Sequence, residues 1–255
     1  MLLDAHAHVD RYGDALPAAL QEIEQQRIFT ISNAMDLESY GRNLEIAAQC
    51  SWVLPIFGVH PWNAPQYVNR LQDLREAIAG SPMLGEIGLD HYFVEDRSEY
   101  PAQRTVLEFF LAAARAAGGR GKVIQLHTKG AEAEILDLLR QYGIRRAIVH
   151  WYSGPLDTFR ELLALGAYFT VGPEVLYSDH IRAIARELPL ARLLTETDNP
   201  GGPRSLTGKP GTPGLIRDVV QGLAGLRNVP AAAIEQAVQA NLARLVQDDI
   251  CLPTE

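Results

Sequence analysis

Short apolar runs alternate with longer segments of mixed polarity along the whole chain. The runs are rich in Val, Ile, Leu and aromatic residues, and most lack a strict alternation with polar residues. This pattern is typical of strands that are buried on both faces of a parallel sheet. It predicts eight strands, Leu2–Val9, Arg27–Ala34, Trp52–His60, Met83–Asp90, Lys122–Thr128, Arg145–Tyr152, Tyr168–Gly172 and Leu193–Asp198.

The segments between these runs have helical periodicity. Pro101–Ala117 and Ala131–Tyr142 are such segments, and the latter places Ile135, Leu138 and Leu139 on one face. Ala231–Gln247 is expected to form a last helix, with Pro230 near its first turn. Eight strand-and-helix units in a chain of 255 residues predict an α/β fold, a (β/α)8 TIM barrel, as a single domain over residues 1–255. An open doubly wound sheet is the alternative, but no glycine-rich dinucleotide fingerprint follows any strand.

Composition narrows the class of protein. Hydrophobic residues make up 47% and charged residues 21% of the chain, as in ordinary globular enzymes. A formal net charge of -8 argues against a stoichiometric DNA-binding module, although bound divalent cations reverse the local electrostatics of an enzyme site. Cys50 and Cys251 have no metal-ligand spacing and favour reduced thiols. No signal peptide and no membrane span is expected, so the predicted location is cytoplasmic.

The histidines concentrate at the carboxyl ends of the predicted strands. The chain has seven, and all except His180 lie at or within a residue or two of such an end. In a barrel these ends converge on one face, where active sites are built. His6 and His8 are two residues apart on a strand and point to the same side, so they either chelate an ion or form a polar pair at a solvated strand edge.

Four further strands carry possible ligands at or near their carboxyl ends. Glu86 lies inside an apolar run, where an unpaired carboxylate is costly, so either a cation or a salt bridge must satisfy it. His127 and His150 end successive strands and are able to complete the shell of a second ion. Asp198 is the natural last ligand and the expected general base toward a metal-activated water, although an aspartate before Asn-Pro also caps turns. His60 ends the third strand and is expected to contact substrate.

Taken in order, the motifs D-A-H-A-H-V-D, G-V-H-P, G-E-I-G-L-D, L-H-T-K, H-W-Y-S-G and E-T-D-N-P resemble the TatD family of metal-dependent deoxyribonucleases, within the amidohydrolase superfamily. The resemblance extends from His6 to about Asn241. It implies one ion bound by His6, His8, Glu86 and Asp198, and a second ion that Glu86 bridges to and that His127 and His150 hold.

The same resemblance implies an activity. It indicates hydrolysis of phosphodiesters in DNA, with 3′-to-5′ exonuclease character on single-stranded ends, by water that two divalent ions (Mg²⁺, Mn²⁺ or Zn²⁺) activate and Asp198 deprotonates. Lys129 stands where the family usually has an arginine, and it either contacts a phosphate or is a solvated residue at a helix start.

This sequence also departs from the family pattern. The R-N-E-P stretch that usually follows the eighth-strand acid is replaced by Thr207–Gly214 (T-G-K-P-G-T-P-G), Trp62 stands where a second histidine is common, and His91 stands where an aromatic residue is usual. The alternative functions are a barrel hydrolase acting on a small ester, lactone, amide or phosphoester, and a scaffold without turnover. Glu86 at the fourth strand favours the TatD type over relatives with a carboxylated lysine there. The complete ligand set argues against a scaffold.

Overall fold

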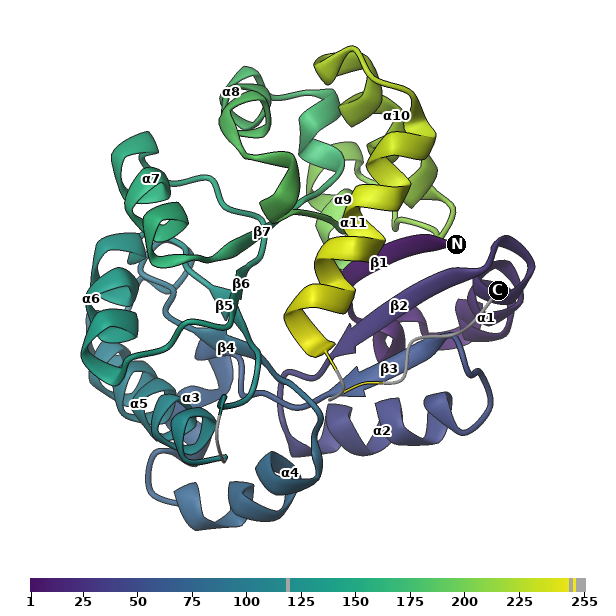
Figure 1. Ribbon diagram of the computed structural model, residues 1–255. Coiled ribbons are helices and arrows are strands. Elements are labelled where there is room, and N and C mark those ends of the chain that lie inside the picture. The colour runs from purple at the N-terminus through teal and green to yellow at the C-terminus, as the bar shows by residue number, and fades with distance from the viewer. Residues whose placement is uncertain (118–119, 248–249, 251–255) are drawn as a thin grey trace. The chain divides into compact units, whose positions relative to one another are not determined.

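The computed structural model describes residues 1–117, 120–247 and 250, and in these the predicted alternation of strands and helices is present (Figure 1). The strands are β1 (Leu2–Ala7), β2 (Ile28–Asn33), β3 (Val53–Ile56), β4 (Leu84–Gly88), β5 (Ile124–His127), β6 (Ala147–Val149), β7 (Tyr168–Val171) and β8 (Leu193–Thr195). All eight predicted strands are confirmed. Each ends one to four residues earlier than predicted, and several of the polar residues at the predicted carboxyl ends, among them His8, His60, Asp90, His150 and Asp198, lie in the loops that follow.

The helices lie between and after the strands. They are α1 (Leu16–Gln26), α2 (Leu37–Ala47), α3 (Ala64–Tyr67), α4 (Arg75–Gly80), α5 (Tyr100–Ala116), α6 (Glu132–Tyr142), α7 (Leu156–Leu165), α8 (Asp179–Glu187), α9 (Gly201–Thr207), α10 (Leu215–Arg227) and α11 (Ala231–Val246). Short 3-10 helices are η1 (Val9–Ala15), η2 (Pro61–Asn63), η3 (Leu71–Leu74), η4 (Arg97–Glu99), η5 (Pro173–Leu176) and η6 (Leu190–Arg192).

The chain divides into two compact units. Unit 1 comprises residues 1–33, 41–55 and 169–255, and unit 2 comprises residues 34–40 and 56–168. Both units are therefore built from segments that are distant in the sequence. That the whole chain forms one domain stays a prediction.

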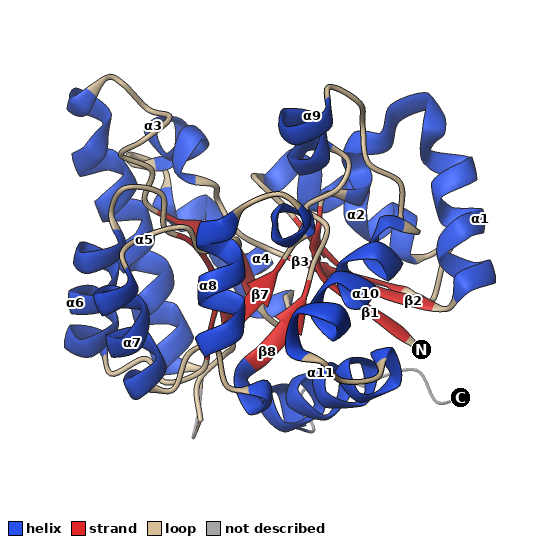
Figure 2. Ribbon diagram, turned by 90° about the horizontal axis from the view of Figure 1, so that it is seen from above, coloured by secondary structure: helices blue, strands red, loops and turns tan. Residues whose placement is uncertain are grey.

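Unit 1 is organised around parallel strand pairs. In the pairing of β1 with β2, Asp4 lies opposite Thr30, and in the pairing of β7 with β8, Thr170 lies opposite Leu194. Helix α11 packs on β8 and β1, and α10 packs on α11 (Figure 2). Ala7, the last residue of β1, belongs to a buried apolar cluster whose other members are Val9, Ile23, Ile46, Cys50 and Val53. Burial of this apolar surface holds β1 rigidly, and β1 carries the first of the predicted ligands.

Unit 2 contains the consecutive parallel strands β4, β5 and β6. Leu126 of β5 lies opposite Ile87 on one side and Val149 on the other. Helix α5 packs on β4, and the buried rings of Phe57 and Phe110 lie 5.7 Å apart between their centroids. Helices α5, α6 and α7 follow one another side by side (Figure 1). This packing gives the ends of β4, β5 and β6 a fixed relative position within the unit.

The structure also bears on the predictions about membrane spans and cysteines. No helix in the described residues is long and apolar enough to cross a membrane. Cys50 is a buried free thiol, and Cys251 lies outside the described residues.

Candidate metal centres

Unit 1 brings His6, His8 and Asp198 together, although Asp198 is distant from both in sequence. The segment that follows β8 is hydrogen-bonded to β1 and to the residue just beyond it. The main-chain N–H of Asp198 donates to the carbonyl oxygen of His6 (2.9 Å), and the N–H of His8 donates to the carbonyl of Asn199 (2.7 Å). These two bonds place Asp198 beside the two imidazoles.

The distances among these three side chains suit an ion. The Nε2 atoms of His8 and His6 lie 3.4 Å and 3.7 Å from Oδ1 of Asp198. Two ligand atoms that are each about 2.1 Å from one tetrahedral ion are about 3.4 Å apart. Both imidazoles are buried, while the Asp198 side chain is 20% exposed. The donor set therefore fits a divalent cation, with its carboxylate reachable by solvent.

A main-chain carbonyl determines which nitrogen of His8 faces this cluster. Nδ1 of His8 lies 2.9 Å from the carbonyl oxygen of Asn33. Because a carbonyl oxygen only accepts hydrogen bonds, Nδ1 carries the proton and Nε2 presents its lone pair. The structure thus provides the neutral tautomer that a metal ligand needs.

The backbone around Asp198 is held in an unusual conformation. Asp198 has a φ of 52°, in the left-handed region that few non-glycine residues adopt. Its carbonyl accepts a hydrogen bond from the N–H of Gly202 (2.7 Å), and the side-chain amide of Asn199 donates to the carbonyl of Thr212 (2.7 Å). The residues that replace the R-N-E-P stretch thus hold the loop that positions Asp198.

A buried carboxylate supports the same loop. The two oxygens of Asp4 accept hydrogen bonds from the main-chain N–H of Thr197 (2.9 Å) and from its hydroxyl (2.6 Å). Burial raises the pKa of Asp4 to about 7, although the Thr197 hydrogen bonds lower it. Asp4 therefore links β1 to the segment before Asp198.

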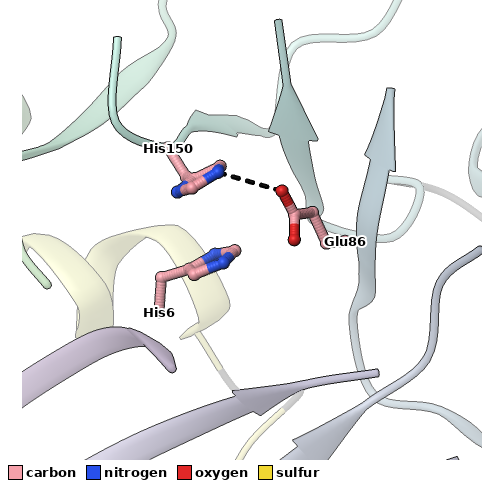
Figure 3. Close-up of side chains that lie close together, drawn as sticks. All are labelled: His6, Glu86 and His150. Carbon is pink, nitrogen blue, oxygen red and sulfur yellow. Dashed lines mark ion pairs between the residues drawn. The ribbon is translucent and has the colours of Figure 1, made fainter. Parts of the chain in front are cut away.

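Unit 2 forms a second cluster around Glu86 of β4. His127 ends β5 and His150 follows β6, and both face the carboxylate. Nδ1 of His127 lies 2.8 Å and Nε2 of His150 lies 2.9 Å from Oε1 of Glu86. Figure 3 shows the pair of Glu86 and His150. All three side chains are buried.

These short distances also suit an ion. Two ligand atoms at right angles, each about 2.1 Å from one metal, are about 3.0 Å apart. Because Nε2 of His127 carries its proton toward the Asp90 carboxylate, Nδ1 faces Glu86 as a lone pair. Two lone pairs at 2.8 Å repel unless a cation or a shared proton lies between them. The residues present therefore fit a divalent metal.

Asp90 holds His127 from its other nitrogen, and sequence reasoning missed this role. Nε2 of His127 lies 3.0 Å from Oδ2 of Asp90, and since a carboxylate accepts, Nε2 carries the proton. Burial alone raises the pKa of Asp90, but the hydrogen bond from His127, with those from the Phe93 N–H and the Trp62 indole, holds that pKa below its usual range. The available signal was an acid directly after the strand that carries Glu86.

His60 lies at the same cluster with a different tautomer. It follows β3, and its Nδ1 accepts a hydrogen bond from the main-chain N–H of Trp62 (3.2 Å). Nε2 therefore carries the proton, and it lies 3.5 Å from Oε1 of Glu86 and 3.3 Å from Nδ1 of His127. The spacing alone would allow His60 to be a ligand. Its tautomer instead favours a hydrogen-bond donor.

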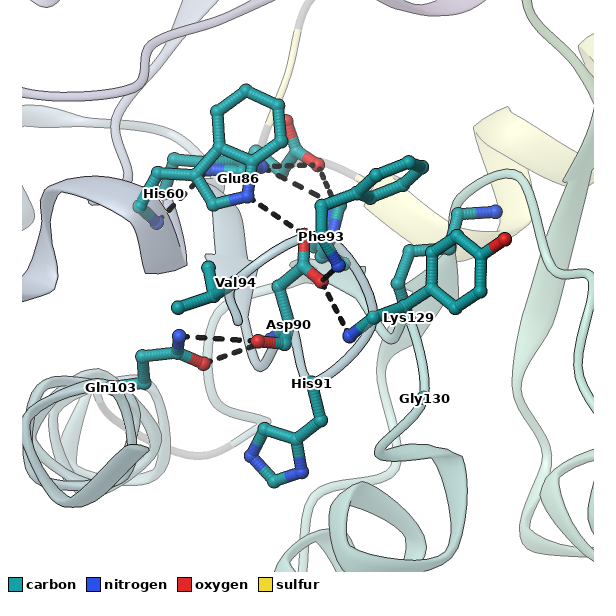
Figure 4. Close-up of polar contacts among 12 residues, drawn as sticks. His60, Glu86, Asp90, His91, Phe93, Val94, Gln103, Lys129 and Gly130 are labelled. Atoms are coloured by element: carbon teal, nitrogen blue, oxygen red, sulfur yellow. Dashed lines mark hydrogen bonds and ion pairs between the residues drawn. The ribbon is translucent and has the colours of Figure 1, made fainter. Parts of the chain in front are cut away.

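Two side chains of helix α5 are hydrogen-bonded to the loop that carries Asp90. The side-chain amide of Gln103 accepts a hydrogen bond from the Asp90 N–H (2.8 Å) and donates to the Asp90 carbonyl (3.2 Å), as Figure 4 shows. The hydroxyl of Tyr100 donates to the carbonyl of Val94 (3.1 Å). Asp90 is thus fixed from both its main chain and its side chain.

The remaining predicted contact, Lys129, follows β5. Its ammonium donates to the carbonyl of Trp151 (2.8 Å) and to the hydroxyl of Ser153 (2.8 Å), so it ties the loop after β5 to the loop after β6. His91 stacks on Tyr100, with 3.8 Å between ring centroids, in unit 2.

Each predicted ligand therefore lies in one of two clusters, and each cluster belongs to one unit. Unit 1 holds His6, His8 and Asp198, and unit 2 holds Glu86, His127 and His150, with His60 beside them. The bridging role of Glu86 stays a prediction.

Comparison with known proteins agrees with the resemblance seen in the motifs. A family model described as TatD-related DNase matches residues 3–247. An uncharacterized metal-dependent hydrolase of Escherichia coli K12, YcfH, is 28% identical over 97% of this chain and 96% of its own length.

Solved structures show the same relationship. The crystal structure of YjjV, a TatD homologue from E. coli K12, superposes with a TM-score of 0.84 at 28% identity, over 96% of this chain and 97% of that one. A TatD-family hydrolase from Entamoeba histolytica shares the fold, with a TM-score of 0.82 at 17% identity, over 96% of this chain and 97% of that one. The predicted fold class, an α/β chain of the TIM-barrel type, is confirmed by these matches. The chain belongs to the TatD-related DNase family of metal-dependent hydrolases.

Proposed function

We propose that this protein is a phosphodiesterase that hydrolyses DNA from single-stranded 3′ ends and uses two divalent ions, one at each cluster. The observation that carries the proposal is that each unit brings buried imidazoles and a carboxylate together at ligand spacing. The description of the family as TatD-related DNase supports DNA as the substrate class.

When bound, a divalent metal would supply Lewis acidity and would lower the pKa of a nearby water molecule. His6 and His8 provide lone pairs from β1. His127 and His150 provide nitrogens toward Glu86 from the ends of β5 and β6. With a net charge of -8, the chain depends on such cations to receive a polyanionic substrate.

Asp198 acts as the general base in this proposal. Its carboxylate is the most exposed group of the unit 1 cluster, at 20%, so water reaches it. The attacking oxygen of water forms a bond to phosphorus, its proton passes to Asp198, and the bond from phosphorus to the 3′ oxygen breaks. The leaving oxygen takes a proton from solvent.

Two side chains of unit 2 belong to the proposal as substrate contacts. The protonated Nε2 of His60 is a donor suited to a phosphate oxygen. Lys129 carries a positive charge two residues beyond His127, and its two oxygen partners hold that charge in place. Neither role requires the residue to bind a metal.

The test is cleavage of 5′-labelled single-stranded DNA in Mn²⁺, with metal content measured on the same samples. We expect the wild type to shorten the strand from its 3′ end and Asp198→Asn to be inactive. Asp179→Asn is the matched control, because Asp179 is fully exposed on α8 of the same unit. Undiminished activity of Asp198→Asn would remove Asp198 from the mechanism. A metal-loaded wild type that leaves DNA intact but hydrolyses small esters, lactones or phosphoesters would replace the nuclease proposal.

A further inference from the structure

We propose that Trp62, Tyr92 and Phe93, here called the aromatic platform, stack an unpaired nucleobase of the substrate strand beside the Glu86 cluster. This inference rests on the proposed function for its substrate class. The three rings are unusually exposed for their size, at 46% for Trp62, 71% for Tyr92 and 59% for Phe93. All three belong to unit 2.

The rings form one group rather than three isolated side chains. The centroids of Tyr92 and Phe93 lie 4.8 Å apart and those of Trp62 and Phe93 lie 6.3 Å apart, in both cases edge to face. Such arrangements are favourable for aromatic pairs. Exposed rings in contact present a continuous apolar surface to a ligand.

A single buried carboxylate holds this group in place. Oδ2 of Asp90 accepts a hydrogen bond from the indole Nε1 of Trp62 (2.7 Å). Oδ1 accepts hydrogen bonds from the main-chain N–H groups of Tyr92 (3.0 Å) and Phe93 (2.7 Å). With the bonds from Gln103 and Tyr100 described above, the loop is ordered before any ligand binds, so stacking costs little conformational entropy.

The platform is continuous with the metal cluster. The indole of Trp62 lies edge to face on the ring of His60, with 4.6 Å between centroids, and the Nε2 of His60 lies 3.5 Å from the Glu86 carboxylate. Asp90 accepts from Trp62 and from His127 through the same oxygen. A base on the platform therefore lies next to the residues proposed to bind the phosphate.

The chemistry of the surface favours a single-stranded nucleic acid as the occupant. Bases of an unpaired strand expose their faces, and every base stacks on an aromatic ring whatever its sequence. In a duplex the same faces are covered by neighbouring base pairs. A net charge of -8 provides no basic field for the backbone, so base stacking is the contact that this surface offers away from the ions.

The experiment measures binding of two probes to the metal-loaded Asp198→Asn protein, which keeps the strands intact. One probe is a short oligothymidylate, and the other is a strand of equal length whose 3′-terminal residues lack bases. Tyr92→Ala and Phe93→Ala remove rings but keep the N–H groups that bind Asp90. Trp62→Phe keeps a ring but loses the indole donor. His91→Ala is the matched control, because that ring packs on Tyr100 instead of joining the platform.

We expect Trp62→Ala to weaken oligothymidylate binding about 5- to 100-fold, the usual worth of one stacked base. Phe93→Ala and Tyr92→Ala weaken it less, Trp62→Phe has an intermediate effect, and His91→Ala has none. Binding of the baseless strand is weak and the same in all variants. The affinity for Mn²⁺, measured by calorimetry, stays unchanged in Tyr92→Ala and Phe93→Ala.

The platform would be overturned if the Asp198→Asn protein with all three rings bound the two strands equally, or if Trp62→Ala weakened binding of both strands equally. If the wild type cleaves DNA but removal of the platform rings leaves oligothymidylate binding unchanged, the platform is rejected and the nuclease proposal stands. Platform-dependent binding of a strand that the wild type never cleaves would reject the nuclease proposal and leave the platform standing.

Discussion

The Nε2 atom of His127 lies 3.0 Å from the buried carboxylate of Asp90, while its Nδ1 atom lies 2.8 Å from Glu86. The imidazole is thus held between two acids, one of which orients it while the other shares its proposed ion. A hydrogen bond to the distal nitrogen of a histidine ligand fixes its tautomer and strengthens its basicity.

Asp90→Asn is therefore expected to weaken metal binding. The amide offers one acceptor oxygen in place of two, so it is unable to accept from His127 and Trp62 and also from the main-chain N–H groups of Tyr92 and Phe93, as the carboxylate does. Loss of such a supporting partner typically lowers metal affinity about 10- to 100-fold. Calorimetric titration of metal-free protein with Mn²⁺ measures the effect. Asp96→Asn is the control, since that exposed carboxylate only caps η4. Unchanged affinity in Asp90→Asn would contradict the supporting role.

Metal stoichiometry tests whether each cluster binds an ion of its own. His8→Ala and His127→Ala each remove a donor from one cluster only. We expect each variant to retain one of two bound equivalents, because the remaining cluster keeps its own donors. Elemental analysis after dialysis against dilute metal gives the counts. Loss of both equivalents in either single variant would show that the clusters do not bind independently.

Lys122 is expected to stabilise unit 2. Its ammonium donates to the carbonyls of Ile78 (2.6 Å), Ala79 (2.9 Å) and Ser81, at the end of α4, and burial lowers its pKa. Lys122→Met leaves these carbonyls without a donor from this side chain, which costs about 1–3 kcal/mol of the free energy of unfolding.

Urea unfolding measures this loss. Lys209→Met is the control for Lys122→Met, because Lys209 is exposed. Equal midpoints for the two variants would mean that the three carbonyls find other partners at no cost.

Asp4 is expected to make stability depend on pH. Its pKa is raised to about 7 in the folded protein, whereas the ordinary value is 3.8. Below pH 3.8 the Asp4 carboxyl is protonated in both the folded and the unfolded protein, and its contribution to the free energy of unfolding is fully present. As pH rises toward 7 the unfolded chain ionises first, so the free energy of unfolding falls, on the order of a few kcal/mol.

The comparison is wild type against Asp4→Asn, both metal-free in chelator, from pH 4 to pH 8. Asparagine keeps an acceptor for the Thr197 N–H and does not ionise. The difference in unfolding free energy between the two proteins is expected to shift in favour of the variant as pH increases. A constant difference across this range would show that the carboxyl titrates normally.

The sequence by itself determined the elements and the ends at which the ligands lie. Apolar runs predicted all eight strands, because a strand buried on both faces tolerates few polar residues, and the histidines stand out at the points where these runs stop. The predicted strands were too long, since those same polar ends belong to loops. The motif order also indicated the family that the comparisons show.

Only the tertiary structure decided how each polar group is used. The Asn33 carbonyl selects the tautomer of His8, and the Trp62 N–H selects the opposite one for His60. Asp90 joins His127 to Trp62, although nothing in the spacing of these residues predicts it. The physical reason is that periodicity reports which side of an element is buried, whereas a hydrogen bond depends on the position and direction of a partner that another part of the chain supplies.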